Sequence, residues 1–369
     1  MLIEDDNTGK GVVEMVPKLP TISIVPLKVY LERDENSTFL NFDFQIHGSG
    51  KRYTIVAISV LVYDKFGSPI LRKSLDSNGP SPGILTIPVR EIPKDGAIDI
   101  FNPFERFDAS IDLQYLEYVF HLTGENRESV KLKTHVAPTE YLQRVDLRLP
   151  FHGDFIVYDG HDYYSHHRRL PLLQPLPQRL GLRANSSRYA YDFCATNCDG
   201  SLSADYPSEN EDFTFGKPVH CSGNGTVVDA ANDIRDNIVG KPQVYSFENF
   251  IRNPMLLAGN YVVIDHGYSE YSVIGHFKQH SLRVEVGDKV IQGQVLGLAG
   301  NSGSSGIPHI HYQLQNGKNI LTSEGLPSVF HEYEIIFGNS TKWVTAGFPK
   351  TGQRLRRKIR NLKIFKIVE

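Results

Sequence analysis

Hydrophobic and polar residues alternate in short segments between residue 20 and about residue 140. This alternation predicts β strands that each bury one face, and a turn-forming stretch, SLDSNGPSPG, separates two of them. About seven such strands are typical of a β-sandwich, and no cluster of His, Asp, Glu and Cys stands out in this half, so we expect a packing or binding module. The segments are SIVPLKVYLER, TFLNFDFQIH, YTIVAISVLVYD, GILTIPVREI and YLEYVFHLT.

The pattern changes near residue 145. The stretch LRLPFHGDFIVYDGHDYYSHH is rich in aromatic residues and histidine, and a loop rich in Pro, Leu, Gln and Arg follows it at 168–187. We interpret this loop as a mobile insertion, because long loops without structure are unusual inside compact domains. After strand-like RYAYDFCA, strands and turns follow densely from Gly216 to Leu314, and only SFENFIRNP predicts a short helical turn. The whole chain is therefore predicted to be all-β.

These changes in pattern predict four parts. We expect a flexible N-terminus at 1–19, a β-sandwich-like accessory domain at 20–142, a second β domain at 143–340 and a basic tail at 341–369. The tail contains QRLRRKIRNLKIF, which is typical of a solvated segment or an edge strand.

Composition narrows the class of protein without indicating its chemistry. The formal net charge of −3 gives no basic footprint of the kind that nucleic-acid binding requires. No run of about 18 apolar residues predicts a membrane-spanning helix, and no basic segment followed by an apolar one predicts a secretory signal. Three cysteines, Cys194, Cys198 and Cys221, are too few and odd in number for a disulfide framework.

The clearest chemical motif is the pair of histidines in Pro308-His309-Ile310-His311. Side chains two apart in a strand point to the same face, so His309 and His311 can line one site. Zinc accepts neutral imidazole nitrogen at about 2.0–2.1 Å. The motif alone is weak evidence, because a chain with 14 histidines in 369 residues has about half of one such pair by chance.

The surrounding sequence makes the motif specific. The stretch GNYVVIDHGYSEYSVIGHFKQHSLRVEVGDKVIQGQVLGLAGNSGSSGIPHIHYQL covers residues 259–314, and GKPVHCSGNGTVVDAANDIRDN covers 216–237. In the order and spacing of these pieces the chain resembles the M23 (lysostaphin/LytM-like) zinc metallopeptidases over roughly residues 145–320. The hairpin VEVGDKVIQGQVLG also looks like half of a biotinyl or lipoyl carrier domain, but it lacks the modifiable lysine setting, and a carrier would not explain the histidine pair.

The resemblance implies a role for each matching residue. His311 and Asp192 match zinc ligands, and His276 and His309 match the two catalytic histidines that lie beside the metal. It also implies an antiparallel β-sheet catalytic domain with zinc (Zn2+) at the floor of a groove. The implied reaction is hydrolysis of an internal peptide bond, with a peptide or the peptidoglycan of bacterial cell walls as substrate. Three protein ligands leave one position for a water whose pKa zinc lowers.

The sequence departs from the family at the first ligand. The common pattern is His-x-x-x-Asp, but four residues before Asp192 stands Arg188, which cannot bind zinc. We expect the missing ligand further upstream in Tyr164-Ser165-His166-His167; the sequence does not decide between the two histidines, and we give a slight preference to His166. The alternative is a degenerate site in an inactive regulator that binds a cell-wall hydrolase or a cell-wall ligand.

Other residues are expected to be structural. Cys194 could face the metal from its strand as a thiolate, but a buried free thiol is the simpler interpretation, as it is for the other two cysteines. His161, His220, His266 and His280 lack the family spacing. The family works in the periplasm, at the cell surface or outside the cell, whereas no signal peptide is visible, so the sequence leaves the compartment open, as it does the oligomeric state.

Overall fold

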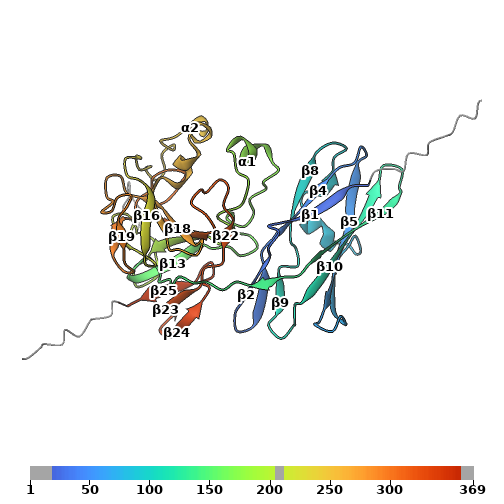
Figure 1. Ribbon diagram of the computed structural model, residues 1–369, viewed down its shortest axis with the longest axis horizontal. Coiled ribbons are helices and arrows are strands. Elements are labelled where there is room, and N and C mark those ends of the chain that lie inside the picture. The colour runs from blue at the N-terminus through green and yellow to red at the C-terminus, as the bar shows by residue number, and fades with distance from the viewer. Residues whose placement is uncertain (1–18, 204–211, 359–369) are drawn as a thin grey trace, which may run out of the picture.

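Two hydrophobic clusters divide the molecule. The computed structural model describes residues 19–203 and 212–358; one cluster draws on residues from Val29 to Val136 and the other on residues from Leu147 to Leu355. We call the surrounding parts the N-terminal lobe (19–140) and the C-terminal lobe (141–358). The lobes lie side by side (Figure 1), and their regular secondary structure is almost entirely strand, which confirms the expected all-β fold.

The N-terminal lobe is sandwich-like, with three sheets around its cluster. Alternation buries one face of each long strand: in β10, Leu116, Tyr118, Phe120 and Leu122 are inaccessible to solvent while the residues between them are partly exposed. The first sheet has the order β1 (Thr21–Val25), β4 (Asp43–His47), β8 (Ala97–Phe101). The second has the order β11 (Ser129–Val136), β10 (Tyr115–Gly124), β5 (Tyr53–Tyr63), β6 (Pro69–Leu75), with β7 (Glu91–Ile92) on β5. The third has the order β12 (Thr139–Glu140), β2 (Tyr30–Arg33), β3 (Ser37–Leu40), β9 (Arg106–Asp108), and a 3-10 turn, η1, spans Gly83–Thr86.

One large antiparallel sheet forms the centre of the C-terminal lobe. Its order is β19 (Lys289–Val290), β16 (Gly225–Ala231), β17 (Asn260–Asp265), β18 (Tyr271–Phe277), β21 (Ile310–Gln315), β14 (Tyr191–Ala195), β13 (Gly153–Asp159), β25 (Arg354–Arg357), β23 (Phe330–Phe337), β24 (Ser340–Gly347). β22 (Gly325–Leu326) pairs with β21, and β15 (Pro218–His220) forms a separate pair with β20 (Val295–Leu298). The helical segments are α1 (Pro175–Arg179), α2 (Phe247–Arg252) and η2 (Pro254–Ala258). α2 confirms the helical turn predicted in SFENFIRNP.

Three neighbouring strands in the middle of this sheet align the polar residues of the site. Asp159 of β13 lies opposite Asp192 of β14, and Asp192 lies opposite His311 of β21. On the other side of β21, His311 lies opposite Gly275, which precedes His276 in β18. Side chains opposite each other in adjacent strands point to the same face. The register alone therefore brings residues more than 100 positions apart in sequence into one row.

The sequence-based expectation of a basic tail differs from the structure. The expected tail at 341–369 contributes two strands: β24, and β25, which pairs with both β13 and β23. Leu355 is wholly buried while Arg356 binds Asp154, so a run that reads as basic is in fact an alternating strand. Residues 359–369, like 1–18 of the expected flexible N-terminus, lie outside the described residues.

The loop at 168–187 is packed rather than structureless. It contains α1 and buries Leu172, Leu180 and Ala184. Figure 1 shows α1 standing between the two lobes. The composition of the loop hid this packing because its apolar residues follow neither a helical nor a strand period.

Across residues 19–203 and 212–358, no helix is long and apolar enough to cross a membrane.

Candidate metal centre

A groove of about 510 Å³ in the C-terminal lobe is lined by all six residues that the sequence singled out. They are His166, His167, Asp192, His276, His309 and His311. The remaining lining residues are neutral, with apolar side chains such as Leu170, Leu257 and Ile320 beside small residues such as Ser304 and Gly306. Among the described residues that line it, Asp192 and the five histidines thus carry the acid–base chemistry near neutral pH.

Asp192 lies at the centre of the group. Its Oδ1 atom is 3.0 Å from Nδ1 of His311, 3.3 Å from Nε2 of His167 and 3.5 Å from Nε2 of His309. The carboxylate side chain is nearly inaccessible to solvent, as are His167 and His276. One buried carboxylate oxygen therefore faces three imidazole nitrogens.

The far nitrogen of each of three rings is bonded to a backbone carbonyl. Nδ1 of His167 donates to the Gly160 carbonyl at 2.8 Å, Nδ1 of His276 to the Ser302 carbonyl at 2.7 Å, and Nδ1 of His309 to the Ile307 carbonyl at 2.9 Å. A carbonyl oxygen can only accept, so Nδ1 carries the proton in each ring. In the neutral ring the opposite nitrogen, Nε2, then presents a lone pair. For His167 that atom is buried and has no hydrogen-bond partner.

His311 is held in the opposite tautomer by a chain of amides. Its Nε2 lies 2.8 Å from Oε1 of Gln313, and Nε2 of Gln313 is in turn bonded to Oε1 of Gln315, whose own Nε2 donates to the Gly317 carbonyl. The Gly317 carbonyl fixes the direction of the chain, so the Gln313 oxygen must accept from His311. The Ser187 hydroxyl donates to the same oxygen at 2.8 Å. Nδ1 of His311, the atom near Asp192, is left with its lone pair.

Gln313 should therefore control how well His311 binds a cation. We expect Gln313→Leu to weaken zinc binding by about 10- to 100-fold, the usual cost of losing a hydrogen bond to a metal-binding imidazole. Gln313→Glu keeps an acceptor oxygen and should retain most of the affinity. The measurement is zinc affinity by competition with a chelating dye. Equal affinities for the Leu variant and the unmodified protein would contradict this orienting role.

Nearby charge and burial shift the pKa of Asp192 in opposite directions. Burial alone would raise the pKa of this carboxyl, but the imidazoles of His167 and His309 outweigh it and hold the pKa well below its usual range. Burial, reinforced by His309 and His311, lowers the pKa of His276 well below its usual value, and burial lowers that of His167. Asp192 is thus held ionised and the ring of His167 is shifted toward its neutral form, which are the states that metal ligation requires.

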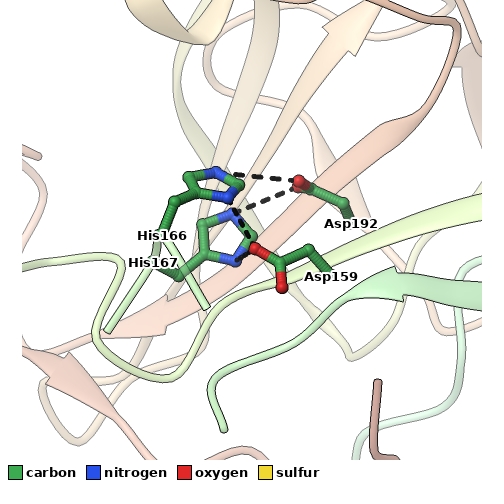
Figure 2. A group of neighbouring side chains, drawn as sticks. All are labelled: Asp159, His166, His167 and Asp192. Atoms are coloured by element: carbon green, nitrogen blue, oxygen red, sulfur yellow. Dashed lines mark ion pairs between the residues drawn. The ribbon is translucent and has the colours of Figure 1, made fainter. Parts of the chain in front are cut away.

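His166 differs from its neighbour in exposure and partners. Its side chain is 71% exposed, against 3% for His167. Its Nδ1 is 2.5 Å from Oδ2 of Asp159, and the hydrogen bond that the ring donates to this carboxylate raises the pKa of His166. Its Nε2 is 3.9 Å from Oδ2 of Asp192. Figure 2 shows both rings and both carboxylates turned toward one another, and one potential ligand atom from each lies within 4.8 Å of the others.

Asp159 and Gln313 are two polar residues of this region that the sequence did not point to. Asp159 ends an alternating strand, IVYD, just before a glycine, and Gln313 lies two residues after His311 in the same strand. Strand periodicity carried two residues beyond His311 would have found Gln313. Neither is part of the spacing that carries the family resemblance.

The expected structural residues have partners of their own. Cys194 is buried with Sγ 3.6 Å from the Pro308 carbonyl, and burial raises the pKa of its thiol well above the usual value. His161 binds Glu32 of the N-terminal lobe at 2.7 Å. Along with His161, the histidines at 220, 266 and 280 lie outside the lining of the groove.

The backbone at His276 is in the left-handed region, with φ of 64°. A non-glycine residue there is uncommon, and such conformations persist only when the surroundings impose them. The hydrogen bond from Nδ1 to the Ser302 carbonyl accompanies this conformation at the end of β18. The strand thus turns His276 toward His309, and the centroids of the two rings are 4.5 Å apart.

The chain is similar in sequence to two bacterial proteins. It is 36% identical over 110 residues to the peptidoglycan DD-endopeptidase ShyA of Vibrio cholerae, a match that covers 29% of this chain and 20% of that protein. It is 29% identical over 122 residues to an uncharacterized metalloprotease of Buchnera aphidicola, which covers 32% of this chain and 26% of that protein. The chain thus matches only about a fifth to a quarter of the length of these relatives.

Solved structures give a weaker likeness. The catalytic domain of lysostaphin from Staphylococcus simulans aligns over 34% of this chain and 86% of its own length, with 21% identity and a TM-score of 0.22. A zinc-containing peptidase from Vibrio cholerae aligns over 80% of this chain and 83% of its own length, with 14% identity and a TM-score of 0.25.

A sequence profile identifies the family. Residues 212–322 match peptidase family M23. The matched range includes His276, His309 and His311, whereas Asp192 and the two upstream histidines precede it. By this match, residues 212–322 of the chain are similar to peptidase family M23.

Proposed function

We propose that this protein is a zinc-dependent endopeptidase that hydrolyses peptide bonds in the stem peptides or cross-bridges of peptidoglycan. The observation that carries the proposal is the convergence of lone-pair atoms on Asp192: Nε2 of His167 at 3.3 Å and Nδ1 of His311 at 3.0 Å, each with its other nitrogen bonded elsewhere. Lone pairs and a carboxylate repel one another unless a cation or a proton lies between them.

The spacing of these atoms supports a tetrahedral ion. Ligands at about 2.0–2.1 Å in a tetrahedron lie roughly 3.3 Å apart, close to both distances. Two imidazoles and one carboxylate are a common zinc donor set that leaves a position open. We therefore propose His167, Asp192 and His311 as the ligands. This choice departs from the sequence-based preference for His166, because His167 is buried with a free Nε2 whereas His166 is exposed and bonded to Asp159.

The two remaining histidines are suited to proton transfer. Zinc in this site would polarise the scissile carbonyl and lower the pKa of a bound water. His276 and His309 line the groove and each keep Nδ1 bonded to a carbonyl, so Nε2 of each ring can accept a proton, after which the ring can stabilise negative charge or protonate the leaving amine. Peptidoglycan as substrate is supported by the likeness to ShyA, whose name states that activity.

The proposal predicts zinc-dependent cleavage. Zinc-loaded protein incubated with purified peptidoglycan and with glycine-rich peptides should generate new termini, read by mass spectrometry, and the chelated protein should not. Zinc at 100 times its dissociation constant should also stabilise the fold by about 2.7 kcal/mol. His311→Ala should lose that zinc-linked stabilisation, because it removes a ligand.

The outcomes separate the two candidate functions. About one zinc per chain with new termini supports the peptidase. No zinc after careful repletion supports the inactive regulator that binds a cell-wall hydrolase or cell-wall ligand. Zinc without cleavage of either substrate would contradict the proposed activity on peptidoglycan.

A further inference from the structure

The segment that links β13 to β14, residues 160–190, carries both upstream histidines and lies between the lobes. Its contacts with the N-terminal lobe are specific and largely buried. Leu173 donates its backbone N–H to Asp99 at 2.9 Å, and His161 binds Glu32 at 2.7 Å. Two arginines of the segment, Arg168 and Arg188, make ion pairs with the lobe. The segment is therefore anchored to a lobe that contributes no residue to the lining of the groove.

Arg168 directly follows His167 in the chain and is almost completely buried. Its guanidinium donates to the Asn102 carbonyl at 3.2 Å and pairs with Glu105 at 3.4 Å, and both partners belong to the N-terminal lobe. From the other side, the Asn185 amide donates to the carbonyls of His167 and Arg168 at 2.9 and 3.3 Å. The backbone next to the candidate ligand is thus held between the N-terminal lobe and the end of its own segment.

Arg188 occupies the position four residues before Asp192. Its side chain is wholly buried and pairs with Asp43 of β4 at 2.7 Å, and its carbonyl accepts a hydrogen bond from Asn41 at 2.8 Å. Glu324 lies 3.8 Å from its Nε. The residue that departs from the His-x-x-x-Asp pattern therefore points away from the groove and toward the N-terminal lobe.

Arg168 and Arg188 depend on these contacts because their guanidinium groups are buried. An arginine out of water needs its acceptors, because an unpaired buried charge is strongly destabilising. The N-terminal lobe supplies the carboxylate of Glu105 to Arg168 and the nearer of the two carboxylates, Asp43, to Arg188, so loss of the lobe would leave Arg188 only Glu324 at 3.8 Å. The conformation of the segment and the docking of the lobe are consequently linked.

We propose that the N-terminal lobe is a positioning element of the metal centre: Asp43 and Glu105, acting through Arg188 and Arg168, hold residues 160–190 in the conformation that presents His167 to Asp192. The inference rests on the proposed function in taking His167 as a metal ligand. It assigns the lobe a role other than targeting or covering the groove, since the described residues that line the groove run from Tyr158 to Ile320.

The test uses the full chain with Asp43→Asn and Glu105→Gln, singly and together. The matched control is Glu117→Gln, which makes the same change in an ion pair with Lys133 between β10 and β11, outside these contacts. We expect the double variant to bind zinc about 10- to 100-fold more weakly by chelator competition. In the metal-free protein, amides of 160–190 should lose protection from hydrogen exchange. The control should match the unmodified protein in zinc affinity and in protection from exchange. Glu105→Asp, which keeps the charge, should recover part of the zinc affinity that Glu105→Gln loses.

The outcomes are distinguishable from failure of the proposed function. A folded double variant with unchanged zinc affinity and unchanged protection would overturn the inference. If the unmodified protein binds no zinc, the proposed function fails, while the exchange measurement on metal-free protein still tests the anchoring. If the double variant does not fold, Glu105→Gln alone carries the test, because that pair is longer and its carboxylate is one-fifth exposed (20%).

Discussion

Replacing His167 with alanine is expected to remove the metal and abolish hydrolysis, whereas replacing the adjacent His166 with alanine should leave both nearly intact. His167 is buried with Nε2 3.3 Å from Asp192 and no other partner for that atom. His166 is 71% exposed and bonded to Asp159. We expect the His167 variant to fall to the level of chelated protein, a loss of at least about 10³-fold in kcat/KM, because the water loses the metal that lowers its pKa.

The adjacent position provides the control for this prediction. His166→Ala changes an exposed side chain and should alter the free energy of unfolding by about 0.5 kcal/mol or less. Zinc content by mass spectrometry of the native protein and hydrolysis of peptidoglycan are measured on both variants. Loss of zinc from the His166 variant alone would reverse the assignment, and loss from neither would remove this pair from the site.

Replacing His309 or His276 with alanine is expected to lower kcat by about 10²- to 10⁴-fold while zinc remains bound. Both rings line the groove and hold Nδ1 on a backbone carbonyl, and their centroids are 4.5 Å apart. Neither belongs to the proposed ligand set, so their removal should affect proton transfer and charge stabilisation rather than metal content. The effect should appear in kcat more than in KM, because these interactions strengthen in the transition state.

The zinc content of the His276 and His309 variants decides whether each residue is a catalytic residue or a ligand. His309 requires particular attention because its Nε2 is 3.5 Å from Asp192, a distance at which it could also reach a cation. A His309 variant that loses its zinc would make this residue a ligand. Full zinc content together with unchanged kcat in both variants would contradict the catalytic assignment. The Asp192→Asn variant weakens the metal site directly, so it should lose zinc, in contrast to the His276 and His309 variants.

The strand pattern predicted most of the fold class. Alternation in YLEYVFHLT matches β10, where every second side chain is buried. Prediction failed where apolar residues have no period. The sequence of 168–187 predicts a mobile insertion because its apolar residues have no period, whereas in the structure Leu180 is buried and the backbone N–H of Leu173 is bonded to Asp99 across the lobe boundary. The basic C-terminal run likewise gave no hint that β25 would pair on both sides.

The sequence predicted which residues make up the candidate site better than it predicted how they are arranged. Spacing and family likeness drew attention to His276, His309, His311 and Asp192, and the structure brings all four into one groove. The same sequence could not separate His166 from His167. Adjacent residues share every local signal, and only packing distinguishes a buried ring from an exposed one.

The sequence by itself determined that this chain is built of strands, that residues 212–322 match peptidase family M23 and which side chains are chemically able to bind or activate a metal. Only the tertiary structure decided that Asp159, Asp192 and His311 stand opposite one another in three adjacent strands. It also decided that Arg188 turns toward Asp43 and not toward the groove. The physical reason is that strand register and buried charge pairs join residues more than 100 positions apart, and no local pattern records such partners.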